Sequence, residues 1–430
     1  MLKILKSKSL ILAILSSSNI AIAFVLQIIT FNIIGPGKET DALFLGLSIP
    51  TFILSIMVTS LNNVLVPFFS GISRKEIGVY TTILLTIFVG GSIFFSVALW
   101  LSIGVWLPLI ANGFDHETYS LCENLTKIQV IAIPFYMLFS VQWSILNGQK
   151  KHIESELPPA IINFLTVPVL LYLLPLYGVY TLAFLYSIKM VLQNIFVFCY
   201  LKKIPLHKFS FEQISEIWMR LKPVMLGAIY YKSEPIIDRS LLTHSASGSL
   251  SLFFLAQQII SAFNQVITKS LVTPNIALLS HAYKSKDTLS FNSVYRKTLT
   301  KILVILCVVS MLFLILGEYA SELLLSFRQD SNSIDAPHIL YTVLFFLFGS
   351  LIGNVLGSFV TSSYYAINNT KTPSYISMIN YTVYIPLKIV AFYFYDINGL
   401  ACVVSLYSLL NVTILYFIFK FKYIKKFDHE

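Results

Sequence analysis

The chain has 430 residues, of which 56% are hydrophobic and 12% charged, whereas an ordinary globular domain has about 45–50% and about 25%. Because 34 Phe and 24 Tyr accompany only 18 Gly and 16 Pro, the composition excludes disordered, collagen-like and coiled-coil proteins. The mean hydropathy of +0.78 indicates a protein that lies in a lipid bilayer. We therefore attribute the net charge of +10 to membrane orientation and not to nucleic-acid binding.

Apolar runs bounded by charged residues, Pro or Gly predict twelve transmembrane helices. The predicted spans are residues 10–34, 42–69, 79–109, 128–146, 161–176, 179–201, 223–242, 250–279, 302–316, 339–365, 375–394 and 400–419. The N-terminus is similar to a secretory signal peptide, in which Ala21-Ile22-Ala23 would be the cleavage site. Because the apolar run continues to Ile34, we expect one uncleaved span there instead.

The basic residues predict the orientation of these spans. If the N-terminus is cytoplasmic, 22 of the 30 Lys and Arg side chains fall in cytoplasmic segments, and only Lys38, Lys127 and Arg328 fall in outside loops. Such an asymmetry favours twelve spans with both termini in the cytoplasm. We expect a multi-pass membrane protein.

The two halves of the sequence resemble each other. Pro67 and Pro274, Pro159 and Pro373, and the pairs beginning at Leu182 and Leu400 occur in the same order, with offsets of 207, 214 and 218 residues. Similar features at similar offsets predict two six-helix lobes related by a pseudo-two-fold axis along the membrane normal.

The predicted lobes are residues 1–201 and 223–430, joined by a linker at 202–222. The linker is basic and carries apolar residues with helical spacing, so we expect a cytoplasmic amphipathic helix. These apolar residues are Phe209, Phe211, Ile214, Ile217 and Trp218. Two bundles joined in this way are typical of transporters in which one bundle rocks against the other.

Four ionisable residues in the seventh span form the main candidate site. Each charge at the centre of a bilayer costs about 2.5–3.5 kcal/mol, so such residues indicate function. Glu234 and Asp238 are four residues apart on one helix face and are candidates for H⁺ or Na⁺ coupling, whereas Lys232 and Arg239 share another face that suits a phosphate. Pro235 predicts a kink or break beside them. The alternative is that these charges neutralise one another or hold the lobes together.

Other polar residues extend this candidate site. Lys269 in the eighth span is a further candidate for substrate binding, and Gln27 and Gln258 are polar groups in the first and eighth spans. Lys189 and Lys388 are weaker candidates, because a lysine near a span end reaches the headgroups. The four cysteines form no metal or disulfide motif, and we expect no catalytic constellation, metal or cofactor besides the possible coupling ion.

Several motifs of the chain resemble the lipid II flippases (MurJ/MviN) of the multidrug/oligosaccharidyl-lipid/polysaccharide exporter superfamily. The residues that carry the resemblance are 35–44, 49–50, 65–67, 237–241, 248–251 and 364–373. The resemblance implies a V-shaped carrier of undecaprenyl-linked sugars, with a central cavity lined by the first, second, seventh and eighth spans. It also implies a location in a bacterial cytoplasmic (inner) membrane, and that Asp41 and Asp238 are acids of the cavity region.

The sequence departs from this family at positions that concern the substrate. Thr51-Phe52-Ile53-Leu54 stand where the family has basic residues, Gln257-Gln258 stand where its eighth span has a basic residue, and two C-terminal spans are missing. We therefore expect a flippase for an O-antigen or capsular repeat unit carried on undecaprenyl diphosphate, in preference to lipid II. Expected partners are this sugar lipid, membrane lipids and other polysaccharide assembly proteins.

Three alternatives stay open on the sequence alone. An ion-coupled exporter of cationic drugs would use Glu234 and Asp238 to hold the charge of the drug. A membrane enzyme acting on lipid-linked sugars would change its lipid covalently, and we do not expect one because the predicted outside loops contain no paired catalytic motif. A scaffold for envelope assembly would tolerate single changes of its intramembrane charges.

Overall fold

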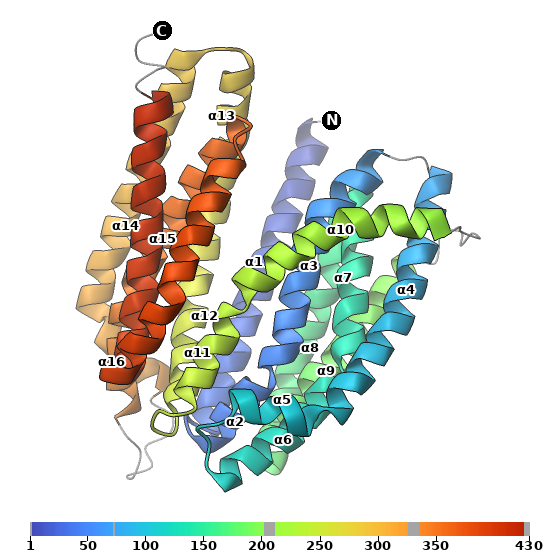
Figure 1. Ribbon diagram of the computed structural model, residues 1–430, viewed down its shortest axis with the longest axis vertical. Coiled ribbons are helices and arrows are strands. Elements are labelled where there is room, and N and C mark those ends of the chain that lie inside the picture. The colour runs from blue at the N-terminus through green and yellow to red at the C-terminus, as the bar shows by residue number, and fades with distance from the viewer. Residues whose placement is uncertain (1, 72–73, 202–210, 326–334, 425–430) are drawn as a thin grey trace. The chain divides into compact units, whose positions relative to one another are not determined.

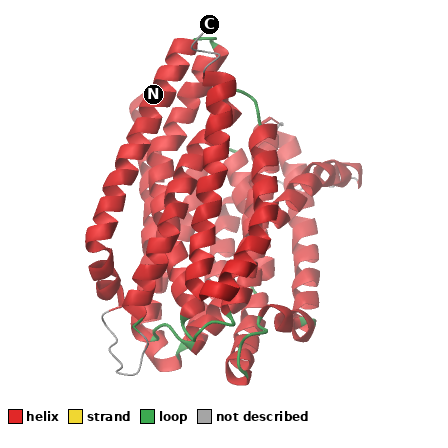
Figure 2. Cartoon of the chain, turned by 60° about the vertical axis from the view of Figure 1, so that its left-hand side comes forward, coloured by secondary structure: helices red, strands yellow, loops and turns green. Residues whose placement is uncertain are grey.

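The computed structural model describes residues 2–71, 74–201, 211–325 and 335–424. Within these ranges the regular elements are all helices, as the composition predicts (Figure 2). Contacts divide the chain into two compact units, Met1–Ser251 and Leu252–Glu430. Residues 202–210 of the predicted linker, and the basic residues Arg328, Lys425 and Lys426, lie outside the described residues.

The first unit contains eleven helices within the described residues (Figure 1). They are α1 (Leu2–Ile33), α2 (Lys38–Gly46), α3 (Ser48–Gly71), α4 (Arg74–Leu101), α5 (Ile103–Ile110), α6 (His116–Val130), α7 (Ile133–Gly148), α8 (His152–Tyr177), α9 (Val179–Leu201), α10 (Phe211–Lys232) and α11 (Glu234–Leu242). Its core is a cluster of Leu, Ile and Val side chains from α3, α4, α7 and α10, with members such as Leu61, Ile145 and Leu221 almost completely buried.

Described residues of the second unit form the remaining elements, apart from the first turn of α12, which belongs to the first unit. They are α12 (Ser249–Ile267), a π-helical turn at Thr268–Val272, α13 (Thr273–Lys284), α14 (Thr288–Leu325), α15 (Ala336–Ala366), α16 (Lys371–Phe419) and a second π-helical turn at Lys420–Ile424. Aromatic rings form much of its core: the Phe419 ring centroid lies 5.3 Å from that of Tyr295 and 4.8 Å from that of Tyr364.

The described helices are consistent with the predicted crossings. Nine are long and apolar enough to cross a membrane, and the pair α6–α7, bent by 41°, makes a tenth. The end of α10 together with α11 covers the charged span predicted at 223–242. The last two predicted spans both lie within α16.

Helix α16 is a hairpin and not one straight rod. Its backbone leaves the helical region at Asp396, where φ is 51° and ψ is −139°. Asn411 bonds to Asn380 at 3.0 Å, and the rings of Tyr384 and Tyr407 stack with centroids 4.5 Å apart. In a straight helix residues 380 and 411 would be roughly 45 Å apart at about 1.5 Å per residue. The predicted spans 375–394 and 400–419 are therefore two antiparallel helices.

Two details differ from the predicted elements. The segment between the third and fourth predicted spans is not a plain loop: it contains α6, whose N-terminus is capped by Asp115, the side chain of which accepts a hydrogen bond from the amide of Thr118 at 3.0 Å. The short ninth span belongs to α14, which is 38 residues long and includes the basic residues around Arg296. In both cases the helix includes polar residues that lie outside the predicted apolar run, so the run alone does not give the ends of the helix.

Two turns of the backbone recur at one of the offsets found in the sequence comparison. The turn residues Lys150 and Asn368, 218 positions apart, have φ of 61° and 60°. Gly178 and Asp396, also 218 positions apart, have φ of 59° and 51° with ψ of −147° and −139°. This offset is the one between Leu182 and Leu400. The hairpin α8–α9 and the hairpin within α16 therefore share one turn conformation.

The boundary between the compact units differs from the predicted lobe boundary. Helix α10 continues from Phe211 to Lys232, so residues 222 and 223 lie inside one helix, and α10 and α11 belong to the first unit. The apolar face of α10 packs on the core of that unit through Ile217 and Leu221. The division into lobes at 1–201 and 223–430 stays a prediction about symmetry.

Candidate functional site

Asp41 lies on the first turn of α2, in a segment that its own sequence shapes. Gly35 adopts φ of 84° and ends α1. The Thr40 hydroxyl donates to the carbonyl of Gly35 at 3.1 Å and accepts from the amide of Gly37 at 2.9 Å. These bonds fix the first turn of α2 and leave the Asp41 side chain buried, with 3% exposed.

The Asp41 carboxylate binds the start of α12. It accepts hydrogen bonds from the backbone amides of Gly248 at 2.6 Å and Ser251 at 2.7 Å, one on each oxygen. Gly248 has φ of 91°, and a Cβ there would lie 3.2 Å from the carbonyl carbon of Pro36. Two amide hydrogen bonds and the helix N-terminus offset the cost of burying the charge of this carboxylate. Asp41 thus has a structural contact, and its predicted role in substrate binding stays a prediction.

Arg239 is also buried and bound to backbone. Its Nη1 donates to the carbonyl of Phe44 at 3.0 Å and to the Ser48 hydroxyl at 2.9 Å. These acceptors lie where α2 ends and α3 begins, so the guanidinium links α11 to the α2–α3 junction. These bonds satisfy one nitrogen of a guanidinium that has only 7% of its surface exposed, which offsets part of the cost of burying its charge. Phosphate binding by Arg239 stays a prediction.

The break predicted beside Pro235 is confirmed. Helix α10 ends at Lys232, and α11 begins at Glu234 with Pro235 in its first turn. Lys232 is exposed, Glu234 is half-buried and Asp238 is almost completely buried. The two acids therefore differ in environment although they are one helical turn apart.

The remaining predicted residues are distributed over both units. Gln27 on α1 is buried, with 8% exposed. Gln258 on α12 and Lys269 in the π-helical turn are exposed in the second unit. π-Helical turns inside longer helices are frequent at functional sites, which marks the position of Lys269. That these residues bind the same ligand as Lys232 stays a prediction.

The expected position of one cation is wrong. We expect Lys388 to reach the headgroups, but its side chain is 1% exposed and its Nζ lies 4.3 Å from the ring centroid of Tyr384. The stacked rings of Tyr384 and Tyr407 explain this burial, because a cation over an aromatic face recovers part of its lost hydration. The tyrosine spaced four residues before Lys388 is the signal in the sequence.

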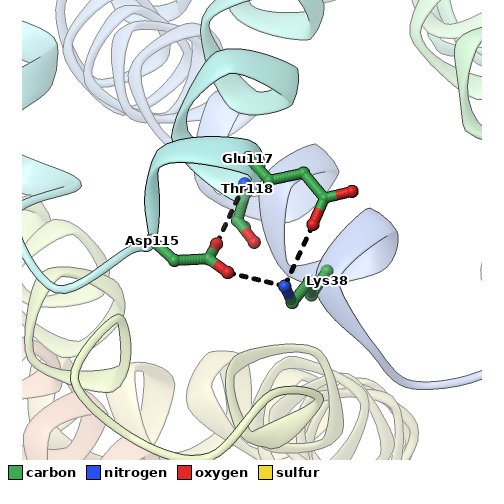
Figure 3. Close-up of polar contacts among 4 residues, drawn as sticks. All are labelled: Lys38, Asp115, Glu117 and Thr118. Atoms are coloured by element: carbon green, nitrogen blue, oxygen red, sulfur yellow. Dashed lines mark hydrogen bonds and ion pairs between the residues drawn. The ribbon is translucent and has the colours of Figure 1, made fainter.

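A cluster of ion pairs joins α2 to α6 (Figure 3). The Lys38 ammonium lies 2.5 Å from the Asp115 carboxylate and 3.2 Å from that of Glu117. Hydrogen bonds from Lys38 and from Thr118 hold the pKa of the Asp115 carboxyl well below its usual range. Nearby, the amide of Gly113 donates to the Thr243 hydroxyl at 3.1 Å. The segment before α6 is thus attached to both α2 and the end of α11.

Comparison with solved structures defines the class of the protein. A structure described as lipid II flippase MurJ in an inward closed conformation matches with a TM-score of 0.82, at 21% identity over 97% of this chain and 89% of that chain. An inward-facing multidrug resistance MATE family transporter of the MOP superfamily matches with a TM-score of 0.79, at 13% identity over 96% of both chains. The fold is that of multi-pass membrane transporters.

Sequence comparison places the chain within this class. The sequence model of the family described as lipid II flippase MurJ matches residues 31–428, and the chain belongs to this family. A probable lipid II flippase MurJ of Buchnera aphidicola subsp. Baizongia pistaciae is 23% identical over 95% of this chain and 82% of the relative. The corresponding protein of Vibrio cholerae is 21% identical over 96% and 82%.

Membership in a flippase family makes the chain a transport protein and not an enzyme. It is a multi-pass membrane protein that flips a lipid-linked sugar. The preference for an O-antigen or capsular repeat unit finds no support, because the matching relatives are named lipid II flippases. That preference rests on a few absent basic residues and two absent C-terminal spans, and the match across 31–428 outweighs them.

Proposed function

We propose that the protein moves lipid II from the cytoplasmic to the outer leaflet of a bacterial cytoplasmic membrane. The observation that carries this proposal is the family match, which extends over residues 31–428 and so includes all but the first predicted span. Both termini lie in the cytoplasm in this proposal, as the distribution of Lys and Arg favours.

The chemistry of the substrate explains what the chain must supply. A diphosphate and its sugars cannot cross bare hydrocarbon, so they need cations and water on their path. Lys232 is an exposed lysine at the end of α10, and Lys269 is exposed in the second unit. In our proposal Lys232 helps to neutralise the diphosphate while the prenyl tail stays in the bilayer.

The acidic residues have a separate role in this proposal. Glu234 begins α11 beside the helix break, and Asp238 is buried one turn later. Protonation of such a pair changes the relative stability of two conformations, which is how an ion gradient drives alternating access. The coupling ion is H⁺ or Na⁺.

Complementation tests the proposed substrate. The chain is expressed in a bacterium whose own lipid II flippase can be depleted, and outer-leaflet lipid II is measured with an enzyme added outside the membrane. We expect the wild-type chain to restore growth and outer-leaflet lipid II, and Lys232→Glu to fail at equal expression. Lys284→Glu, which reverses an exposed lysine at the end of α13, is the matched control and is expected to complement.

Two results would contradict the proposal. One is a correctly inserted wild-type chain that restores neither growth nor outer-leaflet lipid II. The other is restoration of O-antigen export in a strain lacking that flippase, with no effect on lipid II. Efflux of cationic drugs that Lys232→Glu spares would support the drug-exporter alternative.

A further inference from the structure

An apolar groove lies in the first unit, and none of the charged residues of the candidate site lines it. It has a volume of about 640 Å³ and is formed by α3, α4, α7 and α10. Ligand sites in proteins have volumes of about 300–1,000 Å³. The groove is lined by residues that include Phe88, Gly91, Ser92, Phe95, Trp218 and Ile229.

The groove lining offers a ligand almost no hydrogen-bonding groups. Ser92 contributes a hydroxyl, but this hydroxyl already donates to the carbonyl of Val89 at 3.1 Å. Trp218 contributes an indole N–H and is 55% exposed, which suits the headgroup region where Trp is enriched. Phe95 is 43% exposed, so the groove is accessible from the lipid-facing side of α4. Its chemistry selects a hydrocarbon chain.

Positive charge lies beside the groove on α10. At about 100° per residue, Ile217, Trp218, Leu221, Met225 and Ile229 fall within an arc of about 120° on one face of the helix. Lys222 lies just beyond one edge of this arc and is exposed. Arg220 lies beyond the other edge, with its guanidinium carbon 5.3 Å from the ring centroid of Phe68. An apolar face flanked by cations binds anionic lipid surfaces.

We propose that this groove holds an acyl chain of an anionic membrane phospholipid, whose phosphate binds Lys222. The bound lipid is a component of the protein in the bilayer and fills the space between α10 and α4. None of the predicted substrate-binding or ion-coupling residues lines the groove, so this inference does not depend on lipid II being the substrate.

Glycines on α4 offer a matched pair of variants. A Cβ on Gly91, which lines the groove, would meet no atom within 4 Å, and the same holds for Gly90, which does not line it. The phenyl ring in Gly91→Phe would occupy the groove, whereas in Gly90→Phe it would leave the groove free. Both substitutions add the same apolar side chain to the same helix, so they differ only in the groove.

The test counts the lipids that stay bound to the full-length chain. Each variant is placed in nanodiscs of equimolar phosphatidylglycerol and phosphatidylethanolamine, released into mild detergent and examined by native mass spectrometry. Each buried CH₂ contributes about 0.8 kcal/mol, so excluding two of them should weaken phosphatidylglycerol retention on the order of tenfold in Gly91→Phe. Gly90→Phe should match the wild type, and Lys222→Gln should lose the preference for phosphatidylglycerol.

Fluorescence provides a second measurement that needs no folded Gly91 variant. With Trp100, Trp106 and Trp143 replaced by Phe, Trp218 reports on the groove and is expected to be quenched by phosphatidylglycerol with brominated acyl chains. Absence of quenching, or equal phosphatidylglycerol retention by Gly91→Phe and wild type, would overturn the proposal. So would equal retention of phosphatidylethanolamine by the wild type, or displacement of phosphatidylglycerol by stoichiometric undecaprenyl phosphate.

Discussion

Arg239 and Lys232 carry the same charge seven residues apart, yet their surroundings differ. Arg239 is buried and donates to Phe44 and Ser48, whereas Lys232 is exposed. Arg239→Ala should lower the free energy of unfolding by about 1–3 kcal/mol, because buried acceptors lose their donor. Lys232→Ala should leave the melting temperature in detergent within error of the wild type. A stable Arg239→Ala protein that has lost transport would instead show that Arg239 binds substrate.

The surroundings of Lys232 can be probed by thiol chemistry. An exposed charge within a membrane span must face water, so a cysteine at position 232 should react with a charged maleimide. Asp238→Cys should react far more slowly, since Asp238 is 1% exposed. The background has Ala in place of Cys122, Cys199, Cys307 and Cys402. A Lys232→Cys protein that stays unlabelled in every transport condition would exclude this lysine from a substrate path.

The ion pair of Lys38 and Asp115 makes the stability of the folded protein depend on pH. Lys38 and Thr118 lower the pKa of the Asp115 carboxyl in the folded protein. The stability that this carboxylate contributes is therefore fully present above about pH 4, the pKa of an unfolded Asp. It is lost as the pH falls below that value toward the lower folded pKa. The difference in melting temperature between wild type and Asp115→Asn should thus be constant from pH 8 to pH 5 and shrink below pH 4. A difference that shrinks near pH 6 would contradict this assignment.

At the residue level, sequence shows which side chains are unusual but not what they bind. Charges in an apolar run identify Glu234 and Asp238 directly, whereas Asp41 was identified only by the resemblance to the flippase family. The partners of Asp41 are backbone amides about 210 positions later, and those of Arg239 include a backbone carbonyl. Backbone groups have no side-chain signature in sequence. The fold alone brings them to these charges.

Two hairpin turns set the arrangement of elements in both halves of the chain. Gly178 has φ of 59°, and no atom lies within 4 Å of a Cβ built on it. A side chain at this position would therefore cost only the strain of placing a non-glycine residue at positive φ, about 1–3 kcal/mol. Gly178→Ala should lower the melting temperature accordingly, and Asp396→Gly should raise it. Gly104→Ala is the control, because Gly104 lies in a helix with equally open surroundings; an equal loss in the two alanine variants would contradict the argument.

Elements could be predicted where apolar runs are long and bounded. The twelve predicted spans all fall on described helices because hydrocarbon burial dominates their energetics. Helix α6 was missed, since most of its residues are polar and its start depends on the Asp115 cap. The extent of α14 was underestimated for the same reason, because its first turns are polar. Caps and polar turns were readable in the sequence, but a search for apolar runs passes over them.

The whole molecule is a flippase of the MurJ family in which the backbone turn at Gly178 recurs 218 residues later at Asp396. Sequence predicted the transporter class correctly, and the recurring turn is consistent with the predicted repeat. It did not predict the substrate, because the absence of a few basic residues in one chain does not separate one undecaprenyl-linked sugar from another. Family membership over residues 31–428 supports our proposal that the substrate is lipid II.

The most direct measurement depletes the protein in its own host and identifies the lipid-linked sugar that accumulates in the cytoplasmic leaflet. Our account predicts accumulation of lipid II with unchanged covalent structure, reversed by the wild-type chain and not by Lys232→Glu. Accumulation of an O-antigen or capsular repeat unit in place of lipid II, or of no lipid-linked sugar at all, would contradict it.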